Sequence, residues 1–206
     1  MPAYRSPEEG EIRDEVVAHL REQFPGARII HEINHCGFGN RIDVLAVTET
    51  QIAAVEIKSK KDVLKRLPHQ IEAMSQVTQN YYAALHERFM VERHSRLYPP
   101  KEARGAIVWA APKGRRHWPI RYPSQKKFQC LPPGALHMLW SAELKEILKH
   151  LCLPYSRTTM PEAVDLIRWN MTGENITREI CAALRARDCV EADAPIPLTR
   201  DWTKGE

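Results

Sequence analysis

The sequence predicts an α/β protein, in which strands and helices form a core up to about residue 135 and a small helical module follows. Three observations predict this fold class. Short apolar runs bounded by turn residues are typical of strands, and they alternate with segments whose apolar residues recur at helical spacing. After Leu139 only the helical spacing remains. The length of 206 residues and the hydrophobic content of 43% suffice for one sizeable domain with a small appendage.

The expected boundaries are 1–135 for the core, 136–190 for the helical module and 191–206 for a loose tail. The first helix is expected to begin after Ser6, which is a good N-cap residue, and to end at Pro25-Gly26. Its apolar residues recur at helical spacing, at Ile12, Val16, Leu20 and Phe24.

The strands of the core follow this helix. The segment "ARIIHEI" is the first expected strand, and "RIDVLAV" and "QIAAVEI" form a hairpin with a tight turn at Glu49-Thr50. A helix of roughly 62–79 comes next. The pattern leaves open whether "YYAAL" is another strand or a continuation of that helix, whereas "GAIVWAA" is a clear apolar strand.

The module after Leu139 contains three helical segments, "SAELKEILKHL", "PEAVDLIRW" and "NITREICAALRAR". The stretch from "LKEILKHL" to "PEAVDLI" weakly resembles SAP-like helix–loop–helix units that bind DNA. A plain packing or dimerisation module is the favoured reading.

Composition and cysteine usage exclude several classes. No apolar run reaches the length of a membrane span, and the acidic N-terminal stretch lacks the apolar core of a signal peptide. We therefore expect a soluble protein in the cytoplasm. The five cysteines are scattered and form no C-x-x-C pair, so structural disulfides and a zinc ribbon are not expected.

Positive charge is concentrated in one part of the chain. The net charge is only +4, but the segment from Arg96 to Lys127 holds nine Lys/Arg residues and one acid, Glu102. Such a stretch is typical of a surface that binds a polyanion. The alternative is a solvated basic loop.

Charged residues interrupt the two central apolar strands. A two-residue turn at Glu49-Thr50 sets a register that places Asp43 directly opposite Glu56, with Cβ atoms about 5 Å apart. Lys58 projects from the same face as Glu56 because strand side chains alternate. A divalent cation removes the repulsion between two opposed carboxylates, and oxygen ligands suit Mg²⁺ or Mn²⁺. The alternative is a structural ion network at the edge of a sheet.

A third carboxylate, that of Glu9, is expected on the sheet-facing side of the first helix. At about 100° per residue, Glu9 lies near the middle of the apolar face, whereas Glu11 and Glu15 point away. Glu9 is thus a candidate to join the carboxylate cluster. It is also the capping-box glutamate of Ser6, and the two roles do not exclude each other.

These residues carry a resemblance to the PD-(D/E)xK nuclease superfamily: Asp43, then Glu56-Ile57-Lys58, with a glutamate on a preceding helix and a helix after them. Within that superfamily, "EIKSKKDVLKRLPHQ" is similar to an uncharacterised bacterial and phage group with the signature EIKS…D-x-L-x-R-L-x-x-Q. The segment with Glu9, Ile12 and Arg13 resembles the E-x-x-I-R start of that group.

The resemblance implies a restriction-endonuclease-like core, with a mixed central sheet flanked by helices, and a role for each site residue. Asp43 and Glu56 would hold Mg²⁺ or Mn²⁺ with the backbone carbonyl of Ile57, and Glu9 would join directly or through water. Lys58 would orient the attacking water and stabilise charge on the phosphate. Gln70 would position Lys58 or a substrate phosphate. Its alternative is an exposed helix residue.

Two basic surfaces are candidates for DNA binding, because Lys and Arg contacts to phosphates give affinity that does not depend on sequence. Their residues are Lys60, Lys61, Lys65 and Arg66 beside the site, and Arg115, Arg116, Lys126 and Lys127 further along the chain. The second surface also contains aromatic residues that can stack on unpaired bases.

The sequence thus predicts a metal-dependent deoxyribonuclease with a role in DNA repair or recombination or in phage–host processes. DNA is the expected partner, and a homodimer is expected if both strands of a duplex are cut. The rival hypothesis is a catalytically silent protein with a nuclease fold, acting as a DNA- or protein-binding regulator. A third is an interaction protein whose basic loop meets an acidic partner.

Overall fold

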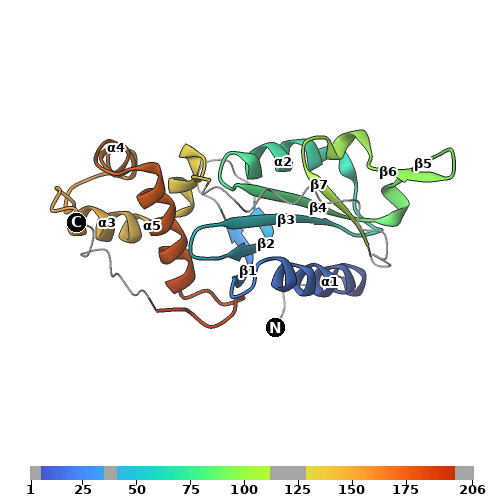
Figure 1. The fold of residues 1–206 in the computed structure, drawn as a ribbon, viewed down its shortest axis with the longest axis horizontal. Helices are drawn as coiled ribbons and strands as arrows, with labels where there is room; N and C mark the ends of the chain where they lie inside the picture. The colour runs from blue at the N-terminus through green and yellow to red at the C-terminus, as the bar shows by residue number, and fades with distance from the viewer. Residues whose placement is uncertain (1–5, 35–40, 112–128, 198–206) are drawn as a thin grey trace.

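The computed structural model describes residues 6–34, 41–111 and 129–197 (Figure 1). The α-helices are α1 (Pro7–Gln23), α2 (Leu67–Ser75), α3 (Ser141–His150), α4 (Met160–Asn170) and α5 (Gly173–Ala186). The strands are β1 (Arg28–Asn34), β2 (Arg41–Val47), β3 (Ile52–Lys58), β4 (Asn80–His86), β5 (Val91–Arg93), β6 (Arg96–Tyr98) and β7 (Ile107–Ala111). Short 3-10 helices are η1 (Leu64–Arg66), η2 (Glu87–Phe89), η3 (Lys101–Ala103) and η4 (Pro133–Met138).

Five strands form a mixed sheet in the order β1-β2-β3-β4-β7. Strand β2 is antiparallel to both β1 and β3, and β3, β4 and β7 are parallel. Figure 1 shows α1 on one side of this sheet and α2 on the other. The segment "YYAAL", which the sequence left open, is part of β4, where it pairs with β3. The structure is therefore a mixed α/β fold with helices on both faces of the sheet.

The turn between β2 and β3 has the predicted geometry. Thr48 donates its main-chain N–H to the carbonyl of Gln51 at 2.9 Å, and the paired residues run from Val47↔Ile52 to Val44↔Val55. This register is the one that the Glu49-Thr50 turn predicted. It fixes which side chains of the two strands lie beside each other.

Helix α1 covers one face of the sheet with the predicted apolar stripe. Ser6 caps the helix, because its Oγ accepts from the N–H of Glu9 at 3.3 Å. The stripe packs against β2, β3, β4 and β7 in one cluster, whose buried members include Ile12, Val16, Leu20, Val44, Val55, Tyr82 and Trp109.

Helix α2 is shorter than the helix of roughly 62–79 that periodicity predicted. The carboxylate of Asp62 accepts from the N–H and hydroxyl of Ser59 at 2.8 and 2.7 Å, which forms a turn before the helix. At the other end, the chain turns after Ser75 because Gln79 binds the start of β3, accepting from the N–H of Ile52 at 2.8 Å. The pairing of β4 with β3 thus overrides local helical propensity.

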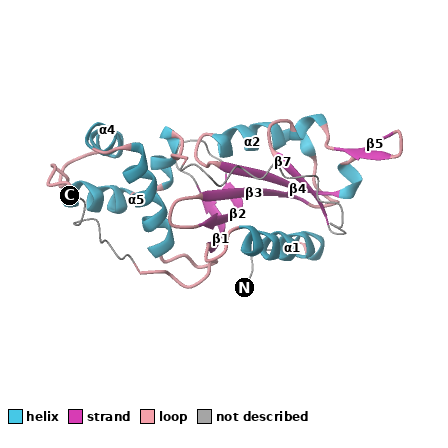
Figure 2. Cartoon of the chain, viewed as in Figure 1, coloured by secondary structure: helices cyan, strands magenta, loops and turns pink. Residues whose placement is uncertain are grey.

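The C-terminal helices share an apolar cluster with the sheet. Buried residues of α3, α4 and α5, such as Leu148, Ile167 and Leu184, belong to the same cluster as Ile30 and Leu45. In Figure 2 these helices lie at one end of the molecule and the β5–β6 hairpin at the other. The expected boundary near residue 135 is therefore a change of architecture within one shared core.

A buried arginine of β1 ties this module to the sheet. Arg28 is 1% exposed. Its Nη1 donates to three carbonyl oxygens at the end of α5, those of Leu184, Arg185 and Arg187, at 2.8, 2.9 and 2.6 Å. A cation at this position satisfies the carbonyls that a helix C-terminus leaves unpaired.

The tail that was expected to be loose from residue 191 is fixed at its beginning. Ile30 of β1 forms an antiparallel bridge with Ala192, and Asp193 donates its N–H to the carbonyl of Ile29 at 2.9 Å. The physical reason is that β1 is an edge strand with backbone groups to satisfy. Within the described ranges, no helix is long and apolar enough to cross a membrane.

Candidate active site

Strands β2 and β3 stop pairing at the level of the two predicted carboxylates. The last paired residues are Val44 and Val55, so Asp43 and Glu56 occupy the next position on each strand. There the Oδ2 atom of Asp43 accepts from the main-chain N–H of Ile57 at 2.8 Å. The carboxylate of Asp43, in place of a main-chain carbonyl, thus accepts from the N–H of Ile57. It lies beside Glu56, as the sequence predicted.

Glu56 is the centre of a hydrogen-bonded group on the α2 side of the sheet. The Nζ atom of Lys58 donates to Oε1 of Glu56 at 2.5 Å, and Nε2 of Gln70 donates to the same oxygen. Glu56 and Lys58 are 3% and 4% exposed, whereas Asp43 is partly open to solvent. The structure therefore brings together Asp43, Glu56, Lys58 and Gln70, and it assigns the helix residue Gln70 to the site.

Gln70 has an unsatisfied acceptor at this site. Its Oε1 atom is buried and has no hydrogen-bond partner among the residues that the structure describes. A buried carbonyl oxygen without a donor is costly, on the order of 1–3 kcal/mol. A water molecule or a substrate hydroxyl is the kind of group that would satisfy it.

Burial shifts the acid–base behaviour of both carboxyl groups. Burial, together with the nearby charge of Asp43, raises the pKa of Glu56 to about 8, although Lys58 and Gln70 oppose the shift. Burial likewise raises the pKa of Asp43 to about 6, against the hydrogen bond from Ile57 and the charge of Arg13. Two adjacent carboxylates with raised pKa values are favourable for binding a cation, which stabilises their ionised forms.

The raised pKa values predict how stability depends on pH. The folded state binds protons at Asp43 and Glu56 that the unfolded state has released, so the free energy of unfolding falls as pH rises through about 6 and about 8. Urea unfolding in EDTA at pH 5 to 9 should show this loss in the wild type. In Glu56→Gln the loss of unfolding free energy between pH 5 and pH 9 should be smaller than in the wild type, by at least about 1 kcal/mol. Parallel pH profiles for the two proteins would contradict the assignment.

Glu9 does not reach the carboxylate pair, because Arg13 lies between them. Oε1 of Glu9 accepts from Nη2 of Arg13 at 2.7 Å, and Nη1 of Arg13 donates to the main-chain oxygen of Asp43 at 2.7 Å. The same guanidinium donates to Oε1 of Glu32 at 2.7 Å. The carboxylate of Glu9 is thus an ion-pair partner, and a role for it at a metal through water stays a prediction.

Arg13 and Glu32 are the two site residues that sequence reasoning missed. Arg13 is 1% exposed and holds β2 at Asp43. Glu32 has a left-handed backbone conformation, with φ of 54°. It lies on β1 opposite Asp43 of β2, and these two residues are skipped in the pairing of the strands. Such a conformation is costly for a residue other than glycine. One signal was present in the sequence: Arg13 follows Glu9 by four residues, the spacing of an ion pair on a helix.

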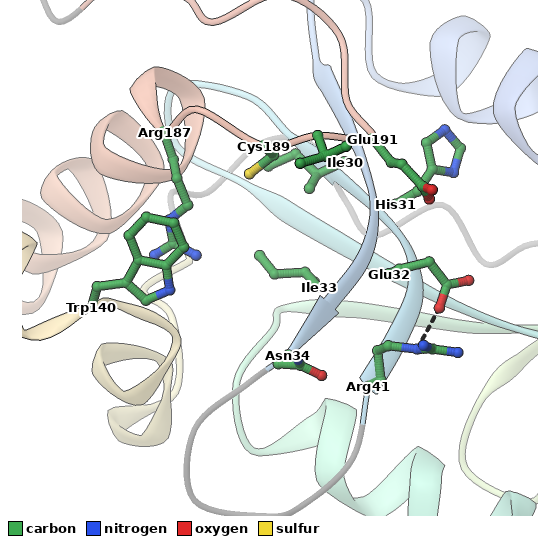
Figure 3. A pocket seen from close by; sticks show the side chains of 11 residues that line it. Ile30, His31, Glu32, Ile33, Asn34, Arg41, Trp140, Arg187, Cys189 and Glu191 are labelled. Atoms are coloured by element: carbon green, nitrogen blue, oxygen red, sulfur yellow. Dashed lines mark ion pairs between the residues drawn. The ribbon is translucent and has the colours of Figure 1, made fainter. Parts of the chain in front are cut away.

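A pocket of about 370 Å³ lies between β1 and the C-terminal module, and Glu32 is one of its lining residues (Figure 3). Its walls come from β1 on one side and from Trp140 and Arg187 of the C-terminal module on the other. Arg41 at its rim forms an ion pair with Glu32. Asp43 and Glu56 do not line this pocket.

The basic residues next to the site are only partly available to a polyanion. Lys60 and Lys61 form ion pairs with Glu8 of α1 at 3.4 and 3.0 Å. A backbone hydrogen bond, and then Lys61, lower the pKa of Glu8 to about 2. Lys65 and Arg66 are exposed on η1. The remaining predicted residues, Arg115, Arg116, Lys126 and Lys127, lie outside the described residues.

The donor set fits a hard divalent cation, although the described side chains do not form a complete cage. In the described ranges, no group of three or more His, Cys, Asp and Glu side chains is arranged to hold a metal ion. Mg²⁺ is usually bound by one or two carboxylates with water and substrate oxygens. Asp43 and Glu56 meet this requirement, since each has a second carboxylate oxygen besides the one that accepts from protein donors.

Comparison with known protein families gives a match over most of the chain. The model of a family described as Bacteriophage P4 protein cII matches residues 4–187. No curated protein and no solved structure matches the chain.

Proposed function

Since the chain belongs to the bacteriophage P4 protein cII family, we propose a phage-related activity for it, that of a metal-dependent nuclease hydrolysing phosphodiester bonds in DNA. One observation carries the proposal. Asp43 and Glu56 lie side by side where β2 and β3 separate, with Lys58 and Gln70 hydrogen-bonded to Glu56. Two carboxylates that can hold a metal ion, with an amine beside them that can stabilise negative charge, suit metal-assisted phosphodiester hydrolysis.

The order of elements supports a restriction-endonuclease-like core of the PD-(D/E)xK type. A helix, three antiparallel strands, a second helix and a parallel strand follow one another as α1, β1, β2, β3, α2 and β4. The acid of the D…E-x-K pattern lies on β2 and the E-x-K segment on β3. Two strands that carry these residues, with a helix before them and a helix after them, support the proposal.

Each residue of the group has a role in the proposed reaction. Asp43 and Glu56 would hold the cation with the carbonyl of Ile57. When bound, Mg²⁺ or Mn²⁺ neutralises phosphate charge and makes a water a better nucleophile. Lys58 places a positive charge beside Glu56, where it orients the attacking water and stabilises charge that develops on the phosphate. Gln70 holds Glu56 in position with its amide, and its buried Oε1 would accept a hydrogen bond from a water or a substrate hydroxyl.

The proposal is tested by incubating the purified protein with labelled single-stranded, duplex and branched DNA in Mg²⁺, Mn²⁺ or EDTA. Asp43→Ala and Lys58→Ala serve as variants. We expect cleavage by the wild type in the metal ions only, and its loss in both variants. Cleavage that persists in EDTA, or in both variants, would assign the activity to another site or a contaminant.

A second candidate is a catalytically silent regulator that keeps the nuclease fold to bind DNA or protein. It is favoured by the burial of Glu56 and Lys58, which are hydrogen-bonded to each other at 2.5 Å, so that each already has a protein partner. The same experiment separates the two candidates. DNA binding in EDTA that both variants retain, with no cleavage of any substrate, would support the regulator.

A further inference from the structure

The β5–β6 hairpin extends from the end of the molecule opposite the C-terminal helices (Figures 1 and 2). Five of its six strand residues are exposed, and only Leu97 is partly buried. The stretch from Arg88 to Arg104 contains five basic residues and two acids, Glu92 and Glu102. The hairpin is therefore a two-stranded ribbon with a net positive charge and little burial of its own.

The tip of the hairpin combines two unfavourable arrangements. Arg93 and Arg96 are direct cross-strand partners, and like charges in this position repel each other. The turn residues between them, His94 and Ser95, have φ values of 50° and 57°, a conformation that glycine or asparagine adopts more easily. An anion between the two guanidinium groups removes the repulsion, just as a cation does for two opposed carboxylates.

The base of the hairpin is fixed beside the candidate active site. Strand β4 runs parallel to β3, with Leu85 paired to Lys58, so the chain leaves the sheet for the hairpin at the end where Lys58 lies. Arg88 donates from Nη2 to the main-chain oxygen of Asp62 at 2.7 Å, which links the hairpin to the loop after Lys58. On the return side, η3 packs against α2 through Ala103, which is 2% exposed. The ribbon thus has a defined position relative to Glu56 and Lys58.

We propose that the β5–β6 hairpin binds the major groove of duplex DNA, with Arg93 and Arg96 on the backbone phosphates, and so holds the duplex next to the carboxylate pair. The major groove of B-form DNA admits a two-stranded β-ribbon. Arginine is suited to phosphate because its planar guanidinium donates two parallel hydrogen bonds. The inference rests on the proposed function in naming DNA as the substrate, and it specifies duplex rather than single-stranded DNA.

The test compares Arg93→Gln/Arg96→Gln with the wild type, using the full chain in EDTA so that binding is measured without cleavage. The probes are one sequence as duplex DNA, single-stranded DNA and duplex RNA, each at several salt concentrations. Arg21→Gln/Arg178→Gln is the matched control, because it removes two exposed charges from α1 and α5, outside the hairpin and outside the SAP-like stretch. Neither pair of substitutions involves a buried side chain, so folding should be unaffected.

We expect the hairpin variant to lose about tenfold or more of its affinity for duplex DNA, and the slope of log affinity against log salt to fall by about 2. The control should bind like the wild type. Affinity for duplex RNA should change little, because the major groove of A-form RNA is too narrow for the ribbon. Unchanged duplex DNA binding, an equal loss on single-stranded DNA, or no duplex binding by the wild type would overturn the proposal.

This outcome is separate from that of the nuclease test. Cleavage by the wild type, together with normal duplex binding by the hairpin variant, would reject the groove contact and keep the nuclease. If the protein does not cleave DNA but its duplex binding depends on Arg93 and Arg96, the groove contact is kept and the nuclease is rejected.

Discussion

The Asp43→Asn variant is expected to lose DNA cleavage by about 1,000-fold or more, and yet to be more stable than the wild type at pH 8. Cleavage is lost because an amide is a poor ligand for a divalent cation compared with a carboxylate. The hydrogen bond from the N–H of Ile57 is kept, because the amide oxygen of asparagine accepts it in place of Oδ2.

Stability rises because the substitution removes a buried charge next to Glu56. The charge of Asp43 is the second cause of the raised pKa of Glu56, after burial. Without it, the free energy of unfolding in EDTA at pH 8 should increase by about 1–3 kcal/mol. A structural ion network would respond in the opposite way, because removing one partner leaves the others unsatisfied.

The measurement combines single-turnover cleavage rates in Mg²⁺ with urea unfolding in EDTA. Asp165→Asn is the control, since Asp165 is 68% exposed on α4 and 3.9 Å from its partner Arg168. We expect it to change neither quantity. If Asp43→Asn were destabilised and still cut DNA, the carboxylate pair would be structural and would not be the site of cleavage.

The Arg28→Met variant is expected to lose about 3–5 kcal/mol of unfolding free energy. Methionine fills a similar volume but leaves the carbonyl oxygens of Leu184 and Arg187 without this donor, whereas that of Arg185 keeps the N–H of Ile196. The variant also loses the hydrogen bond from Nε of Arg28 to the main-chain oxygen of Asp193, at 3.0 Å. The α5 C-terminus and the segment up to Asp193 should then detach from β1. Equilibrium unfolding measures the loss, and amide hydrogen exchange of α5 and of residues 191–193 shows where it occurs.

Arg21→Met is the matched control for this variant. Arg21 also contacts Asp193, at 2.7 Å, but its side chain is 52% exposed. An exposed ion pair contributes about 1 kcal/mol or less. Comparable losses of unfolding free energy in the two variants would mean that the hydrogen bonds from Arg28 to the carbonyl oxygens of α5 add little stability beyond its contact with Asp193.

The central part of the candidate site was predictable because its geometry is local. A two-residue turn at Glu49-Thr50 fixes the register of β2 and β3, and alternation along β3 places Lys58 on the same face as Glu56. These relations depend only on residues close in sequence or directly paired. Helix α1, with its Ser6 cap and its apolar stripe, was predictable for the same reason.

The extent of α2 and the partner of Glu9 were not predictable in this way. Periodicity extends the helix to residue 79, but pairing of β4 with β3 ends it at Ser75. Helical angle places Glu9 on the correct face, but it does not show that Arg13 would take its carboxylate. The end of α2 depends on segments that meet only after folding. So does the position of Arg13, which also contacts Glu32 and the main chain of Asp43.

The fold class, the register of the central hairpin and the position of Asp43 beside Glu56 follow from the sequence, because turn geometry and side-chain alternation act over neighbouring residues. Two other features are visible in the folded structure alone: Arg28 caps α5, and the base of the β5–β6 hairpin lies beside Lys58. These contacts join segments far apart in the chain. They are fixed by the need to satisfy buried charges and backbone groups, which no local pattern records.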